Sequence, residues 1–286
     1  MAGNVIISAS QVSNNTAVGM YSAGIVVLLG GVTVTDGSQI DGNSADGPGG
    51  GIAANFEGAV VISQGSQVDG NTGAGLGGGI VNFSETFGIT VTGQSQVARN
   101  TLTNDEDALV TSGLISVGLV PAVERAFVSG GRGDAVLKAA LQLFVNACAQ
   151  RASMIEQADN AFPNGTDQVG GGISSVLSGP IDVSDGSDIS DNGFANTKFG
   201  AAAVGVGAGI FANLGSITVD GSTISGNTAT GDGGGIWNSS ALSISNSLVI
   251  QNQAVGHGGG IFNQGAFASS NTSVVDNTPD NIYPPS

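Results

Sequence analysis

The feature that most constrains this chain is a repeated sequence motif, here called the phrase. It consists of a β-branched residue, two small or polar residues and an Asn, then a short spacer, glycines and an Ile. The clearest copy begins at Ile40, reaches Asn43 and closes at Ile52. From Asn43 to Asn100, and again from Asn192 to Asn277, the Asn recurs at spacings of 28, 29, 35, 25 and 25 residues. Such self-similarity is the signature of a solenoid, in which each repeat supplies one coil.

Each repeat opens with an alternating run such as Val32 to Thr35, which predicts a strand with its aliphatic side chains inside and its hydroxyls outside. A second short strand carries the Ile of the phrase, and the glycines lead into a third. We expect the phrase Asn itself to form a corner, because Asn tolerates left-handed geometry. The prediction is an all-β solenoid, a right-handed parallel β-helix of about eight coils with three strands per coil.

Composition narrows the functions that such a coil can have. The net charge is −16 with six Lys and Arg in all, so affinity for nucleic-acid phosphates or an anionic membrane is not expected. The glycine runs are followed by no Lys and Ser or Thr pair, and we therefore predict no phosphate, cofactor or metal site. No apolar run is long enough to cross a membrane, and no signal peptide opens the sequence.

The repeat is interrupted once. Residues 1–101 and 169–286 carry the β-helix repeats, and residues 102–168 do not. In that interval Thr103 with Glu106 forms a capping box, and Leu137, Leu141 and Phe144 follow one helical stripe. We predict an α-helical hairpin inserted into one coil of a continuous solenoid, docked on its own solenoid or on a neighbouring copy.

The repeat resembles that of the polymorphic outer membrane protein family, whose tandem GGA-[ILV] and FxxN motifs read here as GGGI and [IV]xxN. The resemblance covers residues 1 to about 100 and about 169 to 282. It implies a right-handed β-helix and a role as an extracellular or cell-surface adhesin.

Two sets of candidate contact residues follow from the coil. The residue after the Ile of a coil should point outward, and it is aromatic in three successive coils: Phe211, Trp237 and Phe262. This column is expected to dock the inserted helices, another subunit or a glycan. Exposed strand edges at the two ends of the stack would invite a second copy, with contacts from Val5, Ile7, Val274, Ile282 and Tyr283.

Three functions compete on these observations. The first is a non-enzymatic structural or adhesive protein that stacks head to tail into a filament or surface layer. The second is ice binding by a flat hydroxyl file that includes Thr33, Thr35, Thr90, Thr92 and Thr218. The third, a polysaccharide-active enzyme, is disfavoured because acids are not clustered with the basic residues that proton transfer needs, and His257 lies alone in a glycine turn.

Overall fold

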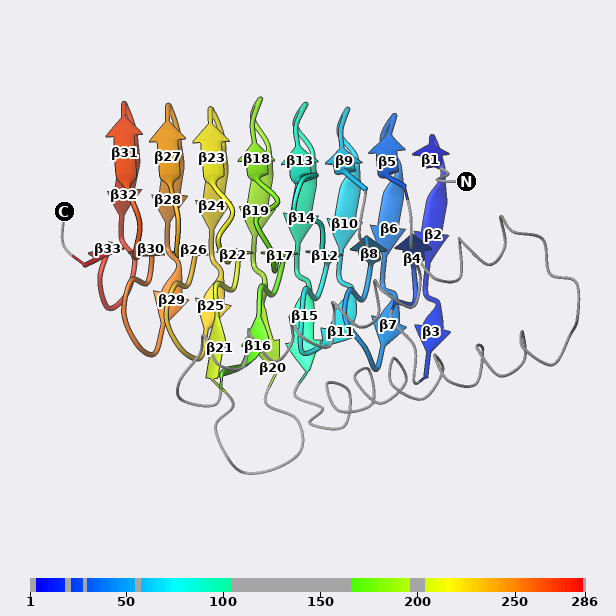
Figure 1. Cartoon of the computed structure of the whole chain (residues 1–286), viewed down its shortest axis with the longest axis horizontal. Helices are drawn as coiled ribbons and strands as arrows, with labels where there is room; N and C mark the ends of the chain where they lie inside the picture. Colours follow the sequence, from blue (N-terminus) through cyan, green and yellow to red (C-terminus); the bar gives the residue numbers. More distant parts are fainter. Residues whose placement is uncertain are drawn as a thin grey trace, which may run out of the picture.

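Throughout the residues that the structure describes, the protein is all-β and its strands are parallel, as a computed structural model of the chain shows (Figure 1). The structure describes residues 4–18, 22–27, 30–54, 58–103, 166–195 and 204–284. Strands of successive repeats stack into four long sheets, here called sheets A to D, and a fifth sheet holds only two strands. Along the chain a coil visits sheets A, B, C and D in turn and then returns to sheet A one position further on.

The strands of each sheet lie in the following order. Sheet A contains β1 (Val5–Ser8), β5 (Val32–Thr35), β9 (Val60–Ile62), β13 (Ile89–Val91), β18 (Ile181–Val183), β23 (Ile217–Asp220), β27 (Leu242–Ser245) and β31 (Phe267–Ser270). Sheet B contains β2 (Gln11–Ser13), β6 (Gln39–Asp41), β10 (Gln67–Asp69), β14 (Gln96–Ala98), β19 (Asp188–Ser190), β24 (Thr223–Ser225), β28 (Leu248–Ile250) and β32 (Ser273–Val275).

Sheets C and D complete the coil. Sheet C contains β3 (Thr16–Ala17), β7 (Ser44–Ala45), β11 (Thr72–Ala74), β15 (Thr101–Thr103), β20 (Gly193–Ala195), β25 (Thr228–Ala229) and β29 (Gln253–Ala254). Sheet D contains β4 (Ile25–Val27), β8 (Ile52–Ala54), β12 (Ile80–Asn82), β17 (Ile173–Ser175), β22 (Ile210–Ala212), β26 (Ile236–Asn238), β30 (Ile261–Asn263) and β33 (Ile282–Tyr283). The two-stranded sheet pairs β16 (Thr166–Val169) with β21 (Val204–Val206).

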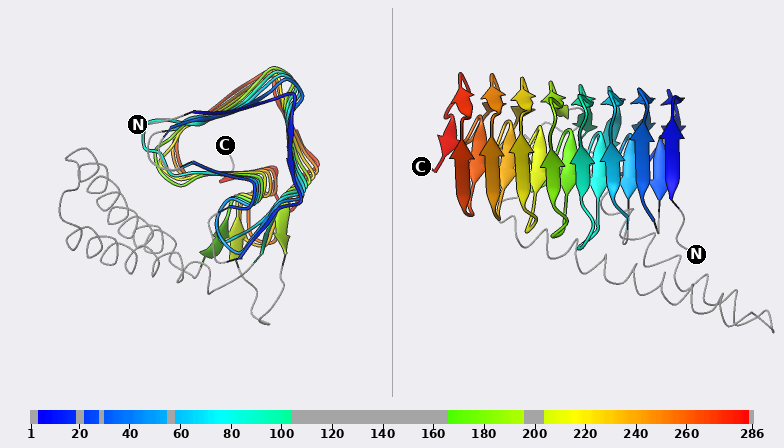
Figure 2. Two further views of the ribbon diagram at one scale, coloured as in Figure 1. Left: turned by 90° about the vertical axis from the view of Figure 1, so that its right-hand side faces the viewer. Right: turned by 90° about the horizontal axis from the view of Figure 1, so that it is seen from above.

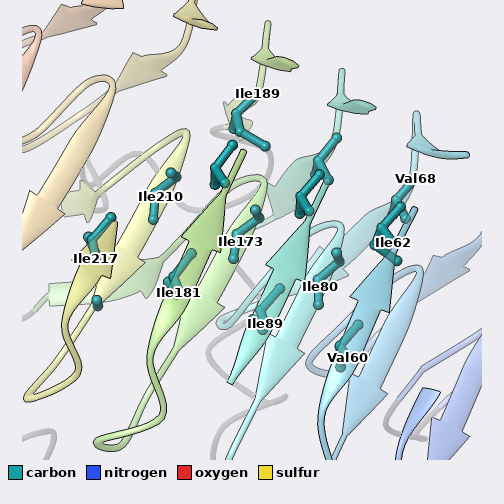
Figure 3. Close-up of a cluster of buried hydrophobic side chains, with 14 of the residues drawn as sticks. Val60, Ile62, Val68, Ile80, Ile89, Ile173, Ile181, Ile189, Ile210 and Ile217 are labelled. Atoms are coloured by element: carbon teal, nitrogen blue, oxygen red, sulfur yellow. The ribbon is translucent and has the colours of Figure 1, made fainter. Parts of the chain in front are cut away.

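The core consists of columns of aliphatic side chains that run the length of the stack (Figure 3). In sheet D the first residue of every strand is Ile, paired in register from Ile25 to Ile282. Alternation in sheet A turns residues such as Val32 and Val34 inward, where both are fully buried. Seen along the stack, the coils superimpose on one outline (Figure 2). The prediction of stacked parallel coils is confirmed.

The coil has four strands, so the predicted three-strand coil is wrong by one. The missed strand is the short one of sheet C, which follows the phrase Asn directly, as in β7 and β25. It is only two or three residues long, too short for alternation to be read. A Thr or Ser followed by Ala after the Asn, as at Thr228 and Ala229, is the signal that marks it.

The corner after sheet B also differs from the prediction. The residue with left-handed backbone geometry is the one before the phrase Asn: Gly42 has φ of 62°, Arg99 of 53° and Asp191 of 54°. The Asn that follows points inward instead. Asn43 is fully buried, and its side chain takes part in hydrogen bonds between coils.

The predicted insertion at residues 102–168 overlaps strands at both of its edges, since β15 extends to Thr103 and β16 begins at Thr166. The helical hairpin predicted between these strands lies outside the described residues. Both strands fall within one coil, between the sheet B strand β14 and the sheet D strand β17. No helix among the described residues is long and apolar enough to cross a membrane.

Candidate functional site

Phe211, Trp237 and Phe262 form one column, as their positions in the repeat predict. Pairing of β22 with β26, and of β26 with β30, places them directly beside one another. The Phe211 and Trp237 ring centroids are 4.8 Å apart, and those of Trp237 and Phe262 are 6.2 Å apart. Tyr283 extends the column, 5.5 Å from Phe262.

The column points away from the aliphatic core, as predicted, and it is buried from solvent. Phe211 is 0% exposed, Trp237 6% and Phe262 8%. Apolar side chains pack over it from strands β16 and β21 and from Leu76, including Val169 and Val206. The helices that were predicted to dock on this column lie outside the described residues.

Backbone geometry explains why the outward face of sheet D is covered. The first glycine of each triplet adopts positive φ and folds the chain back onto the strand that follows. At Gly233, with φ of 68°, a Cβ would lie 2.6 Å from the Ile236 carbonyl oxygen and 2.8 Å from Trp237 Cβ. Real Cβ atoms do not approach so closely, so this position requires glycine both for space and for its backbone conformation. Both faces of the sheet D strands from β8 to β30 are therefore buried, whereas Val26 in β4 is exposed and both residues of β33 are half-buried.

The far end of the column reaches the surface at His257. Its ring stacks on Tyr283 with 4.1 Å between the centroids, and its Nδ1 lies 3.4 Å from Asp280 Oδ2. The backbone N–H of His257 donates to Asp232 Oδ1 over 2.7 Å. Among the described residues no three His, Cys, Asp or Glu side chains are placed to hold a metal ion.

A ladder of buried Asn side chains runs beside the core. Asn43 donates its backbone N–H and its Nδ2 to Asn71 Oδ1, and Asn71 donates to Asn100 Oδ1 in the same way. Further members continue the pattern through Asn192, Asn227 and Asn252 to Asn277. Each interior amide thus satisfies polar groups of two neighbouring coils, which is what a buried amide requires.

The ladder is closed at one end, which the sequence analysis missed. The backbone N–H and Nδ2 of Asn277 both donate to Asn281 Oδ1, each over 3.1 Å. Asn281 lies in a shortened last repeat and takes the place that the Asn of a further coil would occupy. The signal was visible: Asn281 follows Asn277 by only four positions, and an Ile follows at position 282 as in every other repeat.

The residues predicted to make end-to-end contacts lie at the two ends of the stack (Figure 1). Val5 and Ile7 of β1, and Val274 and Ile282 of the last coil, are only partly buried against the core. Among the described residues β1 pairs with β5 alone, and β31 with β27 alone. Tyr283 instead belongs to the aromatic column.

The predicted hydroxyl face is the outer surface of sheet A, but it is not a uniform file. Register places Val61 between Thr33 and Thr90, and Asp182 between Thr90 and Thr218. Two other hydroxyls are already used: Thr35 Oγ1 donates to Gln64 Oε1 over 3.1 Å, and Thr92 Oγ1 donates to Asp185 Oδ2 over 2.7 Å.

Carboxylates interrupt this face with opposite electrostatic environments. Partial burial, then repulsion from Asp185 and Asp220, raises the pKa of Asp182. Hydrogen bonds from Ser245 and Asn246 lower the pKa of Asp220. The pair therefore sits in a field of like charge rather than beside the basic partner that proton transfer would need.

A polar groove of about 440 Å³ follows the corner between sheets A and B over three coils. In these coils one residue forms the corner (Gly221, Asn246 or Asn271), as Ala9 does in the first coil, whereas the second to fifth coils use two, as at Asp36 and Gly37. The shortening is the sequence signal for the groove. It is lined by Gly221, Ser222, Thr223, Asn246, Ser247, Leu248, Asn271, Thr272 and Ser273.

Comparisons with known proteins add no relative. No protein-family model matches the chain, and neither a curated protein nor a solved structure matches it.

Proposed function

We propose that this protein is a non-enzymatic structural or adhesive β-solenoid of the cell surface or extracellular space that associates with further copies through the ends of its stack. The observation that supports the proposal is the state of the end coils. Val5 and Ile7 at one end, and Val274 at the other, leave core side chains partly exposed. Strand edges with free backbone groups are templates for another chain.

We propose further that the chain winds as a right-handed helix of about eight coils. Three sheets of eight strands each support this number of coils. A helical hairpin occupies the interval between β15 and β16. Stacking head to tail joins unlike ends and would yield an open filament or a surface layer. A glycan or a cell-surface partner would bind along the flanks.

Self-association is tested by sedimentation velocity and negative-stain electron microscopy across a range of concentrations. We expect the mass to rise above 27.8 kDa with concentration. A Thr218→Lys variant serves as control, because Thr218 lies in the middle of the stack on the outer face of sheet A and is exposed. Association that is absent in the unaltered protein, or that the Thr218→Lys variant alone abolishes, would overturn the proposal.

Ice binding by sheet A is a second candidate, favoured by the register of its strands. Parallel pairing sets Thr33, Thr90 and Thr218 in one outward column of strands spaced about 4.8 Å apart, with Val61 and Asp182 between them. Inhibition of ice recrystallisation by the protein, lost in a Thr90→Lys variant and retained in an Ile250→Lys variant on sheet B, would support this function. Equal activity in both variants would refute it.

A further inference from the structure

The groove between sheets A and B is lined by no charged side chain, although the chain carries 22 Asp and Glu. The same corner holds Asp36 in the second coil and Asp185 in the fifth, and both are exposed. Within the groove the corner residues are Gly221, Asn246 and Asn271. An ionic ligand would gain no ion pair from this lining, so the groove fits an uncharged ligand that forms hydrogen bonds.

Equivalent residues repeat along the groove. Strands β24, β28 and β32 lie side by side (Figure 1), and their pairing places Thr223, Leu248 and Ser273 in one outward column. The members of this column follow one another at the strand spacing of about 4.8 Å. A ligand that lies along the groove therefore meets an equivalent position at every coil. An extended polysaccharide, whose sugar units have a closely similar length, matches this repeat.

A chain of hydrogen bonds holds the amides on the rim of the groove. Asn271 Nδ2 donates to Asn246 Oδ1 over 2.9 Å, and Asn246 Nδ2 donates to Asp220 Oδ1 over 2.9 Å. Because an amide nitrogen carries two hydrogens, each Asn keeps one N–H donor for a ligand. The Asp220 carboxylate thus orients the amides before a ligand arrives, which lowers the entropy that binding would cost.

The floor of the groove combines fixed hydroxyls, free hydroxyls and one apolar side chain. Three hydroxyls each donate to the backbone carbonyl two residues earlier: those of Ser222, Ser247 and Thr272. The Thr223 and Ser273 hydroxyls have no hydrogen-bond partner among the described residues, and the half-buried Leu248 lies between them. Such a floor suits a sugar, which has hydroxyls around its ring and C–H groups on its faces.

Backbone groups at the groove are already bonded within the stack, which disfavours an extended peptide as the ligand. The Gly221 N–H donates to the Ser245 carbonyl, and the Leu248 N–H donates to the Ser222 carbonyl. A peptide that binds as an added strand draws its affinity from main-chain hydrogen bonds to a free edge. The groove instead offers side-chain amides and hydroxyls.

We infer that the groove binds an uncharged polysaccharide chain laid along the stack, with one sugar unit on each of its three coils. The inference rests on the adhesive role proposed above, and it names the surface and the chemical class of the partner. Asn246 and Asn271 bond to sugar hydroxyls from the rim. Thr223 and Ser273 do so from the floor, where Leu248 contacts the C–H face of a ring. The groove volume of about 440 Å³ lies within the range of small-ligand sites.

The register of sheet B offers a matched pair of variants. Gln39 and Ser273 occupy the same outward column, with Gln39 outside the groove and Ser273 within it. Both are exposed, so arginine at either position leaves the core intact and changes the net charge equally. Asn271→Ala is an independent variant that removes an amide from the rim without adding charge.

The experiment measures binding of the full chain to immobilised oligosaccharides of glucose, N-acetylglucosamine, mannose and xylose, with oligogalacturonate as the anionic comparison. We expect an uncharged class to bind with an affinity that salt does not change, since no ion pair forms. Ser273→Arg should weaken binding at least about tenfold, because the ligand would have to bury or displace the arginine. Asn271→Ala should weaken it about threefold. Gln39→Arg should bind as the unaltered protein does, and circular dichroism checks the fold of each variant.

Three results would overturn the inference: equal affinity of the Ser273→Arg and Gln39→Arg variants, a preference for oligogalacturonate, or no binding to any uncharged oligosaccharide. Self-association in the same preparation would then leave the proposed assembly standing. A protein that binds the oligosaccharide as predicted, yet stays monomeric at all concentrations, would support the inference and refute the assembly.

Discussion

Removing one interior amide from the Asn ladder should destabilise the solenoid far more than removing the amide at its open end. Asn71 is fully buried, and its side chain makes four hydrogen bonds: it accepts two from Asn43 and donates to Ile40 O and to Asn100 Oδ1. Asn71→Ala leaves the Asn43 backbone N–H without its acceptor. It also removes one hydrogen-bond partner from the Asn43 side-chain amide and one from the Asn100 side-chain amide. A buried group left unpaired costs about 1–3 kcal/mol, so the total loss should be roughly 3–5 kcal/mol.

Asn15 is the matched control. It is exposed, and its side chain donates one hydrogen bond in the ladder, over 2.8 Å to Asn43 Oδ1, which still accepts the Asn15 backbone N–H after substitution. Asn15→Ala should cost about 1 kcal/mol or less.

The assay is urea unfolding followed by far-ultraviolet circular dichroism, with hydrogen exchange to locate the loss. The Asn43 backbone N–H should lose protection in Asn71→Ala and keep it in Asn15→Ala. Long repeat arrays can unfold in steps, so exchange near the substitution is compared along with the midpoints. A difference of less than about 1 kcal/mol between the two variants would refute the view that ladder bonds, rather than the aliphatic columns alone, hold neighbouring coils together.

Four further predictions concern single positions. Gly233→Ala should lower the free energy of unfolding in urea by at least about 3 kcal/mol, because a Cβ has no space there. Gly221 also has positive φ, 59°, but nothing lies within 4 Å of the position that a Cβ would take there, so Gly221→Ala should cost only about 1 kcal/mol. Equal losses would contradict the packing explanation. Ser174→Ala should be neutral or stabilising by up to about 1 kcal/mol in thermal unfolding, since the buried Ser174 hydroxyl has no hydrogen-bond partner; a clear loss of stability would reveal a bond to that hydroxyl. The pKa of Asp182 is raised in the folded protein, so its charged form is disfavoured there. Asp182→Asn should therefore raise the urea midpoint at pH 7. The gain should disappear at about pH 3, where the carboxyl is protonated in both the folded and the unfolded protein. The pKa of Asp220 is lowered, so its contribution is present at pH 7 and lost as the pH falls through that pKa; Asp220→Asn should therefore lower the midpoint at pH 7, and a gain there would refute the assignment.

The stacked coils and their Ile columns could be predicted because a repeated phrase must place equivalent residues beside one another. Alternation in β5 and the column from Ile25 to Ile282 follow from that alone. The left-handed corner could not be assigned, because Asn and the residue before it are both compatible with a turn. What decides between them is burial: Asn71 has an amide partner in each neighbouring coil, and the preceding Gly70 has φ of 61° and no side chain to bury.

The aromatic column shows a different limit. Alternation predicts that the middle residue of a sheet D strand faces away from the core, and Trp237 does so. It does not predict whether another part of the chain lies there. Trp237 lies against the fold-back at Gly233 and in one buried cluster with Val169 and Val206, which come from other repeats. A pattern within one repeat reports the direction of a side chain, whereas its exposure is set by contacts between repeats.

The same distinction directs the search for binding surfaces. Sheet D is covered on both faces from β8 to β30, and the Asn ladder has its hydrogen bonds satisfied within the stack, so neither presents groups to a partner there. The surfaces that remain are the outer faces of sheets A and B and the two ends. Of these, the flanks carry acids such as Asp182 and Asp69, whereas the first coil, with Ile6 and Val26 exposed, carries none. A second copy that approached along these acidic flanks would meet like-charge repulsion.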